Sequence, residues 1–244
     1  MLQSKPLKMN KLFFAFLTIS LLSACTFFQN CIEADPEIVT EELSLDKINE
    51  LSLASGIEVH IQQAESQSVS FEGPANYLEV LNQNVKNGEW VIKFDRCLKE
   101  AQKVKLNISL VDLKGLEING SGKIIGSNTF MGDDLELEIA GSGDIDLDLD
   151  YKSLSNEING SGTIKLRGKV KSQEIQINGS GDVLAIQLNS DNTEVEINGS
   201  GDVEVSTSYS LNVEVNGSGD VKYVGSPKEL NSEINGSGKL EQVN

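Results

Sequence analysis

The second half of the chain repeats one short phrase, Gly-Ser-Gly, seven times at nearly even spacing. Successive copies lie 18 to 21 residues apart. Helical repeats need units of about 33 residues or more, whereas periods near 20 residues with strand-like content are typical of β-solenoids. The spacing therefore predicts that each copy marks the same corner of one coil, and that the coils stack. The first glycines of the copies are Gly120, Gly141, Gly160, Gly179, Gly199, Gly217 and Gly236.

The residues around the glycines alternate in polarity with a period of two. In residues 135–149, LELEIAGSGDIDLDL, every second position holds Leu, Ile or Gly, and the positions between are mostly acidic. This pattern indicates strands with one dry and one solvated face, which form a core only when repeats stack. We expect an all-β fold, a parallel β-helix with about 19–20 residues per repeat. Each repeat would be two short strands joined at Gly-Ser-Gly and closed by a looser polar segment, such as residues 188–193 or 206–212.

Stacking would place equivalent residues of the phrase in columns along the solenoid. Glycine fits a sharp bend toward a narrow interior, and the asparagines that precede it can hydrogen-bond from coil to coil. We interpret the phrase mainly as scaffolding. The functional alternative is that the serine and aspartate columns form a binding ridge. The candidate ridge comprises Ser142, Asp144, Ser180, Asp182, Ser200, Asp202, Ser218 and Asp220.

The aspartate column raises the question of a bound cation. Asp182, Asp202 and Asp220 are expected on consecutive coils about 5 Å apart, where carboxylates repel unless they are solvated, splayed or bridged by cations. The phrase is similar to the calcium-binding repeats of secreted toxins, but those repeat every nine residues. We therefore expect no cofactor and no metal, and structural calcium is the alternative.

The N-terminus has the order of features of a bacterial lipoprotein signal peptide. Three lysines precede an apolar run, residues 12–22, that is shorter than the roughly 20 residues of a membrane span. The tetrapeptide Leu-Ser-Ala-Cys follows and resembles a lipobox. We predict that residues 1–24 are removed, that Cys25 carries the lipid, and that residues 25–44 form a tether. An ordinary secretory signal with a coincidental cysteine is the alternative.

Export would place the remaining two cysteines, Cys31 and Cys97, in an oxidising compartment. A disulfide between them is the favoured interpretation, and it would tie the start of the mature chain to the folded body. Two free thiols, or pairing with another molecule, are the alternatives. Because the sequence contains no Cys-x-x-Cys, it indicates neither a redox motif nor a thiolate zinc site.

The segment before the first Gly-Ser-Gly is β-like but lies outside the repeat register. Residues 45–118 contain several alternating runs, and Asn87-Gly88 between two of them is typical of a hairpin turn. We expect this segment to form irregular coils that cap the N-terminal end of the solenoid. The repeat region itself is expected to span residues 119–244.

The charge and the scarcity of reactive residues restrict the classes of function. The chain has 37 acidic and 20 basic side chains, a net charge of −17, so nucleic acid is not an expected partner. Its one histidine, His60, lies on an alternating strand with no sign of a triad. Acid-rich runs such as residues 144–150 match the solvated side of a strand better than a catalytic pair. No catalytic residue is expected.

Several features together resemble a known bacterial family. They are the lipobox, an irregular β segment, the run VKLNISLVDLKGLEINGSG (residues 104–122) and the Gly-Ser-Gly-Asp repeats. This order is similar to the GIN-domain family of auto-transporter adhesin heads, common in Bacteroidetes, over roughly residues 45–240. The resemblance implies an exported, β-helical protein. It supplies no catalytic residues.

We therefore expect a non-enzymatic lipoprotein of the cell envelope that acts as an adhesin or binding module. Its lipid would hold it to the outer membrane, facing the periplasm or the surface, because Thr26 replaces the Asp of an inner-membrane retention signal. The partner would be a glycan, an envelope protein or a host-surface protein. The alternatives are a polysaccharide-active enzyme on a β-helix and a purely structural envelope protein.

Overall fold

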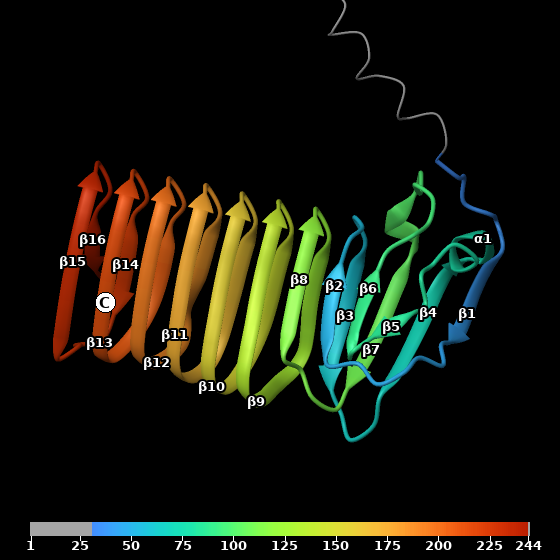
Figure 1. Cartoon of the computed structure of the whole chain (residues 1–244), viewed down its shortest axis with the longest axis horizontal. Helices are drawn as coiled ribbons and strands as arrows, with labels where there is room; N and C mark the ends of the chain where they lie inside the picture. Colours follow the sequence, from blue (N-terminus) through green and yellow to red (C-terminus); the bar gives the residue numbers. More distant parts are fainter. Residues whose placement is uncertain (1–30, 244) are drawn as a thin grey trace, which may run out of the picture.

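The structure, a computed structural model, describes residues 31–243. The predicted signal peptide, residues 1–24, and the predicted lipidation site, Cys25, lie outside the described residues. Residues 31–243 form a flattened β-solenoid whose coils stack along one axis, with an irregular cap at the N-terminal end (Figure 1). The expected fold class, an all-β parallel solenoid, is confirmed.

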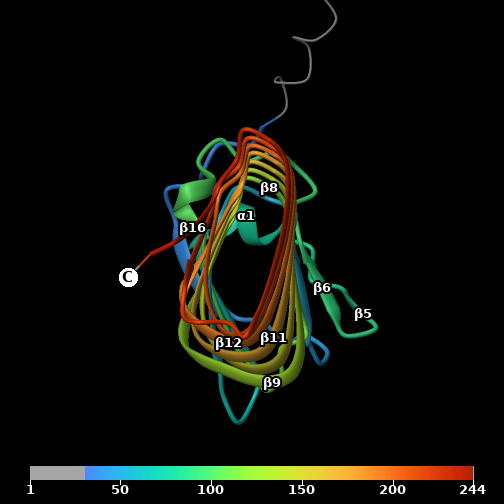
Figure 2. The same cartoon turned by 90° about the vertical axis from the view of Figure 1, so that its left-hand side faces the viewer.

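Five long strands each make almost one complete coil. They are β9 (Lys123–Gly141), β10 (Asp144–Gly160), β11 (Thr163–Gly179), β12 (Asp182–Gly199) and β13 (Val203–Gly217). Each starts after one Gly-Ser-Gly, crosses a first face, turns at a rounded bend and returns on a second face (Figure 2). The expectation of two short strands with a loose closing segment was wrong, because residues 188–193 and 206–212 lie within β12 and β13. The polar bend stays in strand conformation because its side chains find partners inside the solenoid.

Successive coils are parallel and are in register along the second face, whereas the register shifts on the way to the bend in three of the coil pairs. Asn159 pairs with Asn178, and Asn178 pairs with Asn198, so equivalent letters of the repeat lie beside one another. Apolar side chains at alternate positions point inward from both faces, and those of Ile158 and Ile177 are fully buried. Burial of each such side chain contributes about 1.5–3 kcal/mol to the free energy of folding, so these columns are the main stabilising feature of the fold.

The cap extends the same two faces with shorter strands. On the first face, β9 is followed by β3, β7, β4 and β1, and on the second face β9 is followed by β8, β2, β6 and β5. Asn87 and Gly88 adopt positive φ angles of 54° and 92° between β5 and β6, as the predicted hairpin requires. The cap elements are β1 (Ile38–Glu42), β2 (Glu50–Leu53), β3 (Glu58–Gln63), β4 (Ser68–Pro74), α1 (Ala75–Leu78), β5 (Val85–Lys86), β6 (Glu89–Ile92), the 3-10 helix η1 (Ala101–Lys103), β7 (Lys105–Leu110) and β8 (Gly115–Gly120).

The cap differs from the coils in strand direction and core composition. Strands β1 and β4 run antiparallel to their neighbours, whereas the coils are parallel. The largest buried side chains, Trp90, Tyr77 and Phe71, lie in the cap and close the core at this end. Part of the segment predicted as a tether also belongs to the cap: residues 38–42 form β1, because Val39 packs against the core.

The last coil is divided into shorter strands, β14 (Val221–Val224), β15 (Glu229–Gly236) and β16 (Leu240–Gln242). Strand β15 continues the second face from β13, and β16 continues the first face from β14. Among residues 31–243, no helix is long and apolar enough to cross a membrane.

Candidate functional site

The Gly-Ser-Gly phrases form a single narrow edge along the solenoid. Each first glycine has a positive φ between 127° and 151°. A Cβ at Gly199 would lie 2.0 Å from the carbonyl oxygen of Gly179 on the preceding coil, and one at Gly201 would lie 2.0 Å from that of Gly181. Both positions therefore require glycine, because the backbones of neighbouring coils touch at this edge. The expectation that glycine marks the bend of each coil is confirmed.

Between the two glycines of each phrase lies a serine that faces solvent. The backbone N–H of Ser200 donates to the carbonyl of Gly179 at 2.8 Å, and the other serines from Ser142 onward repeat this bond to the preceding coil. The side chains themselves are exposed. The edge thus presents one file of hydroxyls, belonging to Ser121, Ser142, Ser161, Ser180, Ser200, Ser218 and Ser237.

The aspartates of the candidate ridge take part in the scaffold. Oδ1 of Asp182 accepts the backbone N–H of Asp202, and Oδ1 of Asp202 accepts that of Asp220, both at 2.9 Å. Oδ1 of Asp220 in turn accepts the N–H of Lys239 at 2.9 Å. Each carboxylate thus uses one oxygen to join two coils and keeps its second oxygen and its charge. Sequence reasoning placed these residues in one column but did not find this bond.

Earlier coils satisfy the same backbone group differently. The N–H of Asp144 donates to the carbonyl of Gly122, and the N–H of Thr163 donates to that of Gly143, each at 3.0 Å. Because both acceptors are backbone carbonyls, neither bond needs an acidic side chain on the preceding coil. The column can therefore hold a threonine, Thr163, in place of an aspartate. The aspartate ladder therefore belongs to the C-terminal coils, and Asp144 lies in the same column without being part of it.

The asparagine column forms a continuous ladder over the later coils. Nδ2 of Asn178 donates to Oδ1 of Asn159 at 3.0 Å, and Asn198, Asn216 and Asn235 each donate to the preceding asparagine at 3.2 Å. The second N–H of Asn198 reaches Oε1 of Glu196 on its own strand at 2.8 Å. Asn159, Asn216 and Asn235 hold Glu157, Glu214 and Glu233 in the same way.

The glutamates held by this ladder belong to an acidic column on the second face, which continues toward the cap. Glu117, Glu138 and Glu157 lie directly beside one another in this column. Burial raises the pKa of Glu138, and the charges of Glu117 and Glu157 raise it further. Beside Glu138 the ladder is interrupted, because Ala140 occupies the position of the asparagine whose amide holds the glutamate on later coils.

An acidic groove of about 1090 Å³ surrounds Glu138 where the cap meets the first coils. Nine carboxylates and one lysine, Lys114, line it, and its walls come from β2, β6, β8, β9 and β10. Within residues 31–243, no group of three or more His, Cys, Asp or Glu side chains is arranged to hold a metal ion. Sequence reasoning missed this groove, because its acids come from distant segments of the chain.

A cluster of buried polar side chains at the bend was also missed. Nε2 of Gln173 donates to the hydroxyls of Ser190 and Thr193, which are 2.6 Å apart. Thr207 bonds to two backbone carbonyls of the bend, and Asn156 bonds to one on the next coil. The signal was present in the sequence, because Asn156 and Gln173 occupy inward positions of the alternation.

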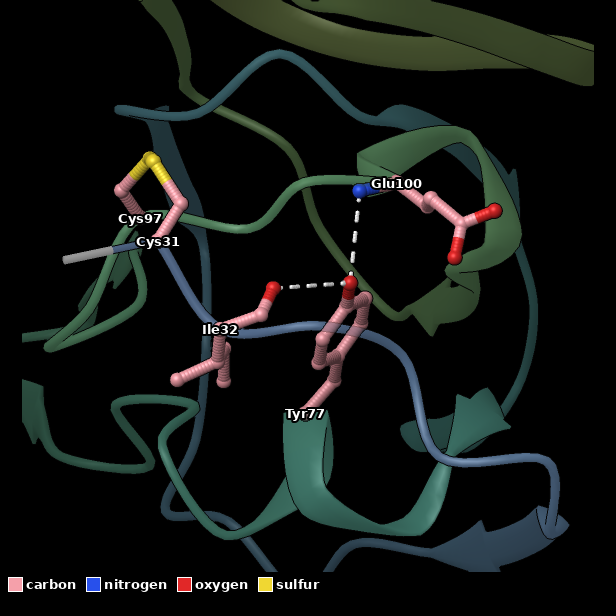
Figure 3. The surroundings of a disulfide bond; sticks show 5 residues. All are labelled: Cys31, Ile32, Tyr77, Cys97 and Glu100. Atoms are coloured by element: carbon pink, nitrogen blue, oxygen red, sulfur yellow. Dashed lines mark hydrogen bonds between the residues drawn. A yellow bond between two sulfur atoms is a disulfide. The ribbon is translucent and has the colours of Figure 1, made fainter. Parts of the chain in front are cut away.

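The cap contains a disulfide between Cys31 and Cys97, the pair expected to form one (Figure 3). It joins two cysteines 66 positions apart in the sequence and holds the first described residue against the segment before η1. Beside it, the Tyr77 hydroxyl donates to the Ile32 carbonyl at 3.4 Å and accepts the Glu100 N–H at 3.3 Å. The start of the described chain is therefore fixed to the capped end of the solenoid.

His60, the one histidine, lies on β3 with its Nε2 2.8 Å from Oε1 of Glu58. Both side chains are exposed on the strand surface. The interaction joins two positions two residues apart and brings no serine hydroxyl to the imidazole. Its geometry matches a surface pair on a strand and not a nucleophile and base.

Two comparisons with known proteins, one with family profiles and one with solved structures, agree with this fold. The sequence profile of the family described as "Putative auto-transporter adhesin, head GIN domain" matches residues 47–227. A "putative adhesin" from Bacteroides fragilis has a similar structure, with a TM-score of 0.83 and 23% identity over 87% of this chain and 100% of that chain. No functionally curated protein sequence matches this chain.

Two further solved structures show the same architecture. A "putative adhesin" from Parabacteroides merdae has a TM-score of 0.71 and 20% identity over 88% of this chain and 100% of that chain. A "putative lipid binding protein" from Parabacteroides distasonis has a TM-score of 0.70 and 22% identity over 87% of this chain and 99% of that chain. At such identities the likeness establishes the fold alone. Because the family profile matches most of its length, the chain belongs to the head GIN domain family.

Proposed function

We propose that this protein is an exported, lipid-anchored binding module of the cell envelope, without enzymatic activity, whose Gly-Ser-Gly edge engages a repetitive partner. The partner is a glycan or a protein of the envelope or of a host surface. The family name and the names of two of the similar structures, which are called putative adhesins, support a place at the cell surface or in the envelope.

One observation carries the proposal: seven serine hydroxyls lie in single file, all exposed, on an edge where the backbones of neighbouring coils are in close contact. Coils repeat about every 4.8 Å, so the same group recurs at a fixed interval. A polymer with evenly spaced hydroxyls can contact several coils at once, and weak contacts then add. Next to this file, Asp182, Asp202 and Asp220 each keep one carboxylate oxygen that the ladder does not use.

The signal-peptide pattern and the structure of the cap support the lipid anchor. A lipid on Cys25 would lie six residues before Cys31, whose disulfide holds the chain to the capped end. The capped end would then lie near the membrane, and the later coils with the aspartate ladder would extend away from it. This arrangement would expose the ridge to partners outside the membrane.

A binding screen with charge variants tests the ridge. The purified mature protein is applied to a glycan array, with and without calcium, and each ligand found is tested again with Asp182→Asn/Asp202→Asn/Asp220→Asn. Asparagine keeps the Oδ1 acceptor, so the ladder is preserved while three charges are lost. We expect binding to fall at least tenfold, and a Ser180→Ala/Ser200→Ala/Ser218→Ala variant to weaken binding as well.

The matched control removes the same charge elsewhere. Glu65, Glu174 and Glu194 are exposed and lie outside both the ridge and the acidic groove, and changing all three to Gln should leave binding unchanged. If both ridge variants bind every ligand as the unmodified protein does, the ridge is not the binding surface. If the mature protein binds no glycan and no surface protein, the binding-module proposal fails as a whole.

The anchor has its own test. Mass spectrometry of the protein extracted from membranes should find the mature N-terminus at Cys25 with a diacylglyceryl group. The Cys25→Ser variant should leave the membrane fraction. An unmodified Cys25, or cleavage at another position, would contradict the lipoprotein assignment without affecting the ridge.

The acidic groove favours a second candidate, a polysaccharide-active enzyme. Glu138 has a raised pKa, as a general acid requires, and lies among other carboxylates in a groove large enough for several sugar rings. The surplus of negative charge disfavours uronate substrates, so a neutral or cationic polysaccharide is the appropriate probe. Turnover that disappears in Glu138→Gln would establish the enzyme and end the non-enzymatic proposal.

A further inference from the structure

The two ends of the solenoid differ in how they are closed. At the N-terminal end, the outermost strands are β1, five residues long with Glu41 and Glu42 near its end, and β5, only two residues long. At the C-terminal end, the outermost strand of the second face is β15, eight residues long and paired with β13 alone. Its other edge has no partner among the described residues, although unpaired strand edges are sites of association.

The exposed edge of β15 is accompanied by apolar surface. The side chain of Leu230 is 45% exposed, and Ile234 and Leu240 are only partly buried against the core. The same positions one coil earlier, Leu211 and Val215, are fully buried. The last coil therefore leaves uncovered the apolar surface that a further coil would bury.

We infer that the C-terminal end binds a second copy of this chain, tail to tail, with β15 of each copy paired antiparallel about a two-fold axis at Ser232. A two-fold contact uses the same surface on both copies and closes as a dimer. Stacking of the C-terminal end on the N-terminal end of another copy would form fibres. The short outer strands β1 and β5 offer no matching eight-residue edge for that arrangement.

The register follows from the sequence of β15, Glu-Leu-Asn-Ser-Glu-Ile-Asn-Gly. Residues directly opposite in an antiparallel pair point to the same face, so an axis on Ser232 places Leu230 against Ile234 of the second copy on the inner face. On the outer face, the same axis places Glu229 opposite Asn235 and Asn231 opposite Glu233. Every acid is then opposite an uncharged amide.

Neighbouring registers would be less stable, because they bring glutamates together or interrupt the apolar core. An axis at Glu233 would bring this glutamate against its own copy, and an axis at Asn231 would place Glu229 against Glu233. Directly opposite like charges destabilise a strand pair by roughly 0.2–1 kcal/mol. An axis between two residues would place inward residues opposite outward ones and break the continuity of the core. The register at Ser232 is therefore the favoured one.

The dimer also bears on the proposed function, on which this consequence rests. The disulfide fixes the start of the described chain to the capped end, so tail-to-tail pairing places the two Cys25 anchors at opposite ends of the dimer. Such a dimer suits contact between two membranes that both carry this protein. The pairing itself needs no lipid, so it can be tested separately.

Sedimentation of the full chain with Cys25→Ser, which cannot be lipidated, tests the pairing. We expect the weight-average mass to rise from monomer toward dimer between about 10 µM and about 500 µM protein. Leu230→Lys should abolish this rise while the thermal unfolding curve remains unchanged. A chain that is monomeric over the whole range, or a dimer that persists in Leu230→Lys, would overturn the inference.

Crosslinking tests the register. In the same background, Ser232→Cys should form a disulfide-linked dimer at least tenfold faster than Glu229→Cys, because residues 229 of the two copies lie about 20 Å apart in this register. Equal rates for the two variants would exclude an axis at Ser232. Neither result depends on glycan binding or on lipidation.

Discussion

Oδ1 of Asp202 accepts the backbone N–H of Asp220, one coil further along, at 2.9 Å. The same bond joins Asp182 to Asp202 and Asp220 to Lys239. An acidic residue that looks like a ligand in the sequence thus serves first as a link between coils. Any binding by this column has to use the remaining oxygen and the charge.

The link predicts that the two simplest substitutions of Asp202 have different effects. Asp202→Ala leaves the N–H of Asp220 without its acceptor and should lower the free energy of unfolding by about 1–2 kcal/mol. Asp202→Asn keeps an acceptor oxygen in the same place and should change it by less than about 0.5 kcal/mol. Urea denaturation measures both, and equal effects of the two variants would contradict the link.

The gap at Ala140 predicts a stabilising substitution. Ala140→Asn would place an amide between Asn119 and Asn159 and beside Glu138, where the later coils have one. We expect the free energy of unfolding to rise by about 1 kcal/mol, the net value of a typical hydrogen bond. Ala140→Asp has nearly the same shape but adds a charge and no donor, and it should destabilise. A neutral or destabilising Ala140→Asn would mean that the ladder cannot extend to this coil.

The raised pKa of Glu138 predicts a change of stability with pH. The folded chain holds the proton at pH values where the unfolded chain, with a pKa near 4.5, has lost it. The contribution of this group to stability therefore falls as pH rises from 4.5 through the folded pKa. Glu138→Gln removes this loss.

Compared with the unmodified protein, Glu138→Gln should have a free energy of unfolding that is higher by roughly a few tenths of a kcal/mol at neutral pH. Near pH 4 the two free energies of unfolding should be equal. Urea denaturation at the two pH values measures the difference. Gln176, which occupies the same column two coils later, shows that an amide fits there. A gain that is larger at low pH than at neutral pH would contradict the sign of the shift.

The contact between coils predicts that Gly199 cannot be replaced. Gly199→Ala would place a Cβ 2.0 Å from the carbonyl oxygen of Gly179 at a φ of 151°, so the coils must separate. We expect a loss of about 2–4 kcal/mol in the free energy of unfolding. Ser200→Ala, one residue later and exposed, should change it by less than about 0.5 kcal/mol. If both variants lowered the free energy of unfolding by less than about 0.5 kcal/mol, the backbones of neighbouring coils would not be in close contact at this edge.

The sequence was sufficient to predict the coil but not its details. The glycine spacing and the two-residue alternation indicated the parallel solenoid, because both follow from backbone geometry that every coil repeats. The bend was misread, since polar runs such as residues 206–212 look like loops. Their side chains instead bond to the preceding coil, as the Thr207 hydroxyl does to the Asp191 carbonyl and the Ser208 hydroxyl to the Ser190 carbonyl.

The candidate site was predictable only in part. The columns of serine and aspartate followed from the repeat, but the use of Asp202 as a link depends on a backbone group that no sequence pattern shows. The acidic groove joins Glu50, Glu89 and Glu138, which are far apart in the chain and meet only after the cap has folded. One absent side chain, at Ala140, distinguishes Glu138 from the other glutamates of its column.

The ridge, the ladders and the dimer all require that seven serines lie in single file, one per coil. Electron–electron spin distances between nitroxides measure this directly, in chains with Cys25→Ser and the Cys31–Cys97 disulfide intact. Labels at Ser121→Cys and Ser237→Cys, six coils apart, should give one narrow distance of about 30 Å. Moving the first label to Ser142→Cys should shorten it by about 5 Å, the height of one coil. A broad distribution, or a distance that does not shorten, would contradict the stacked arrangement.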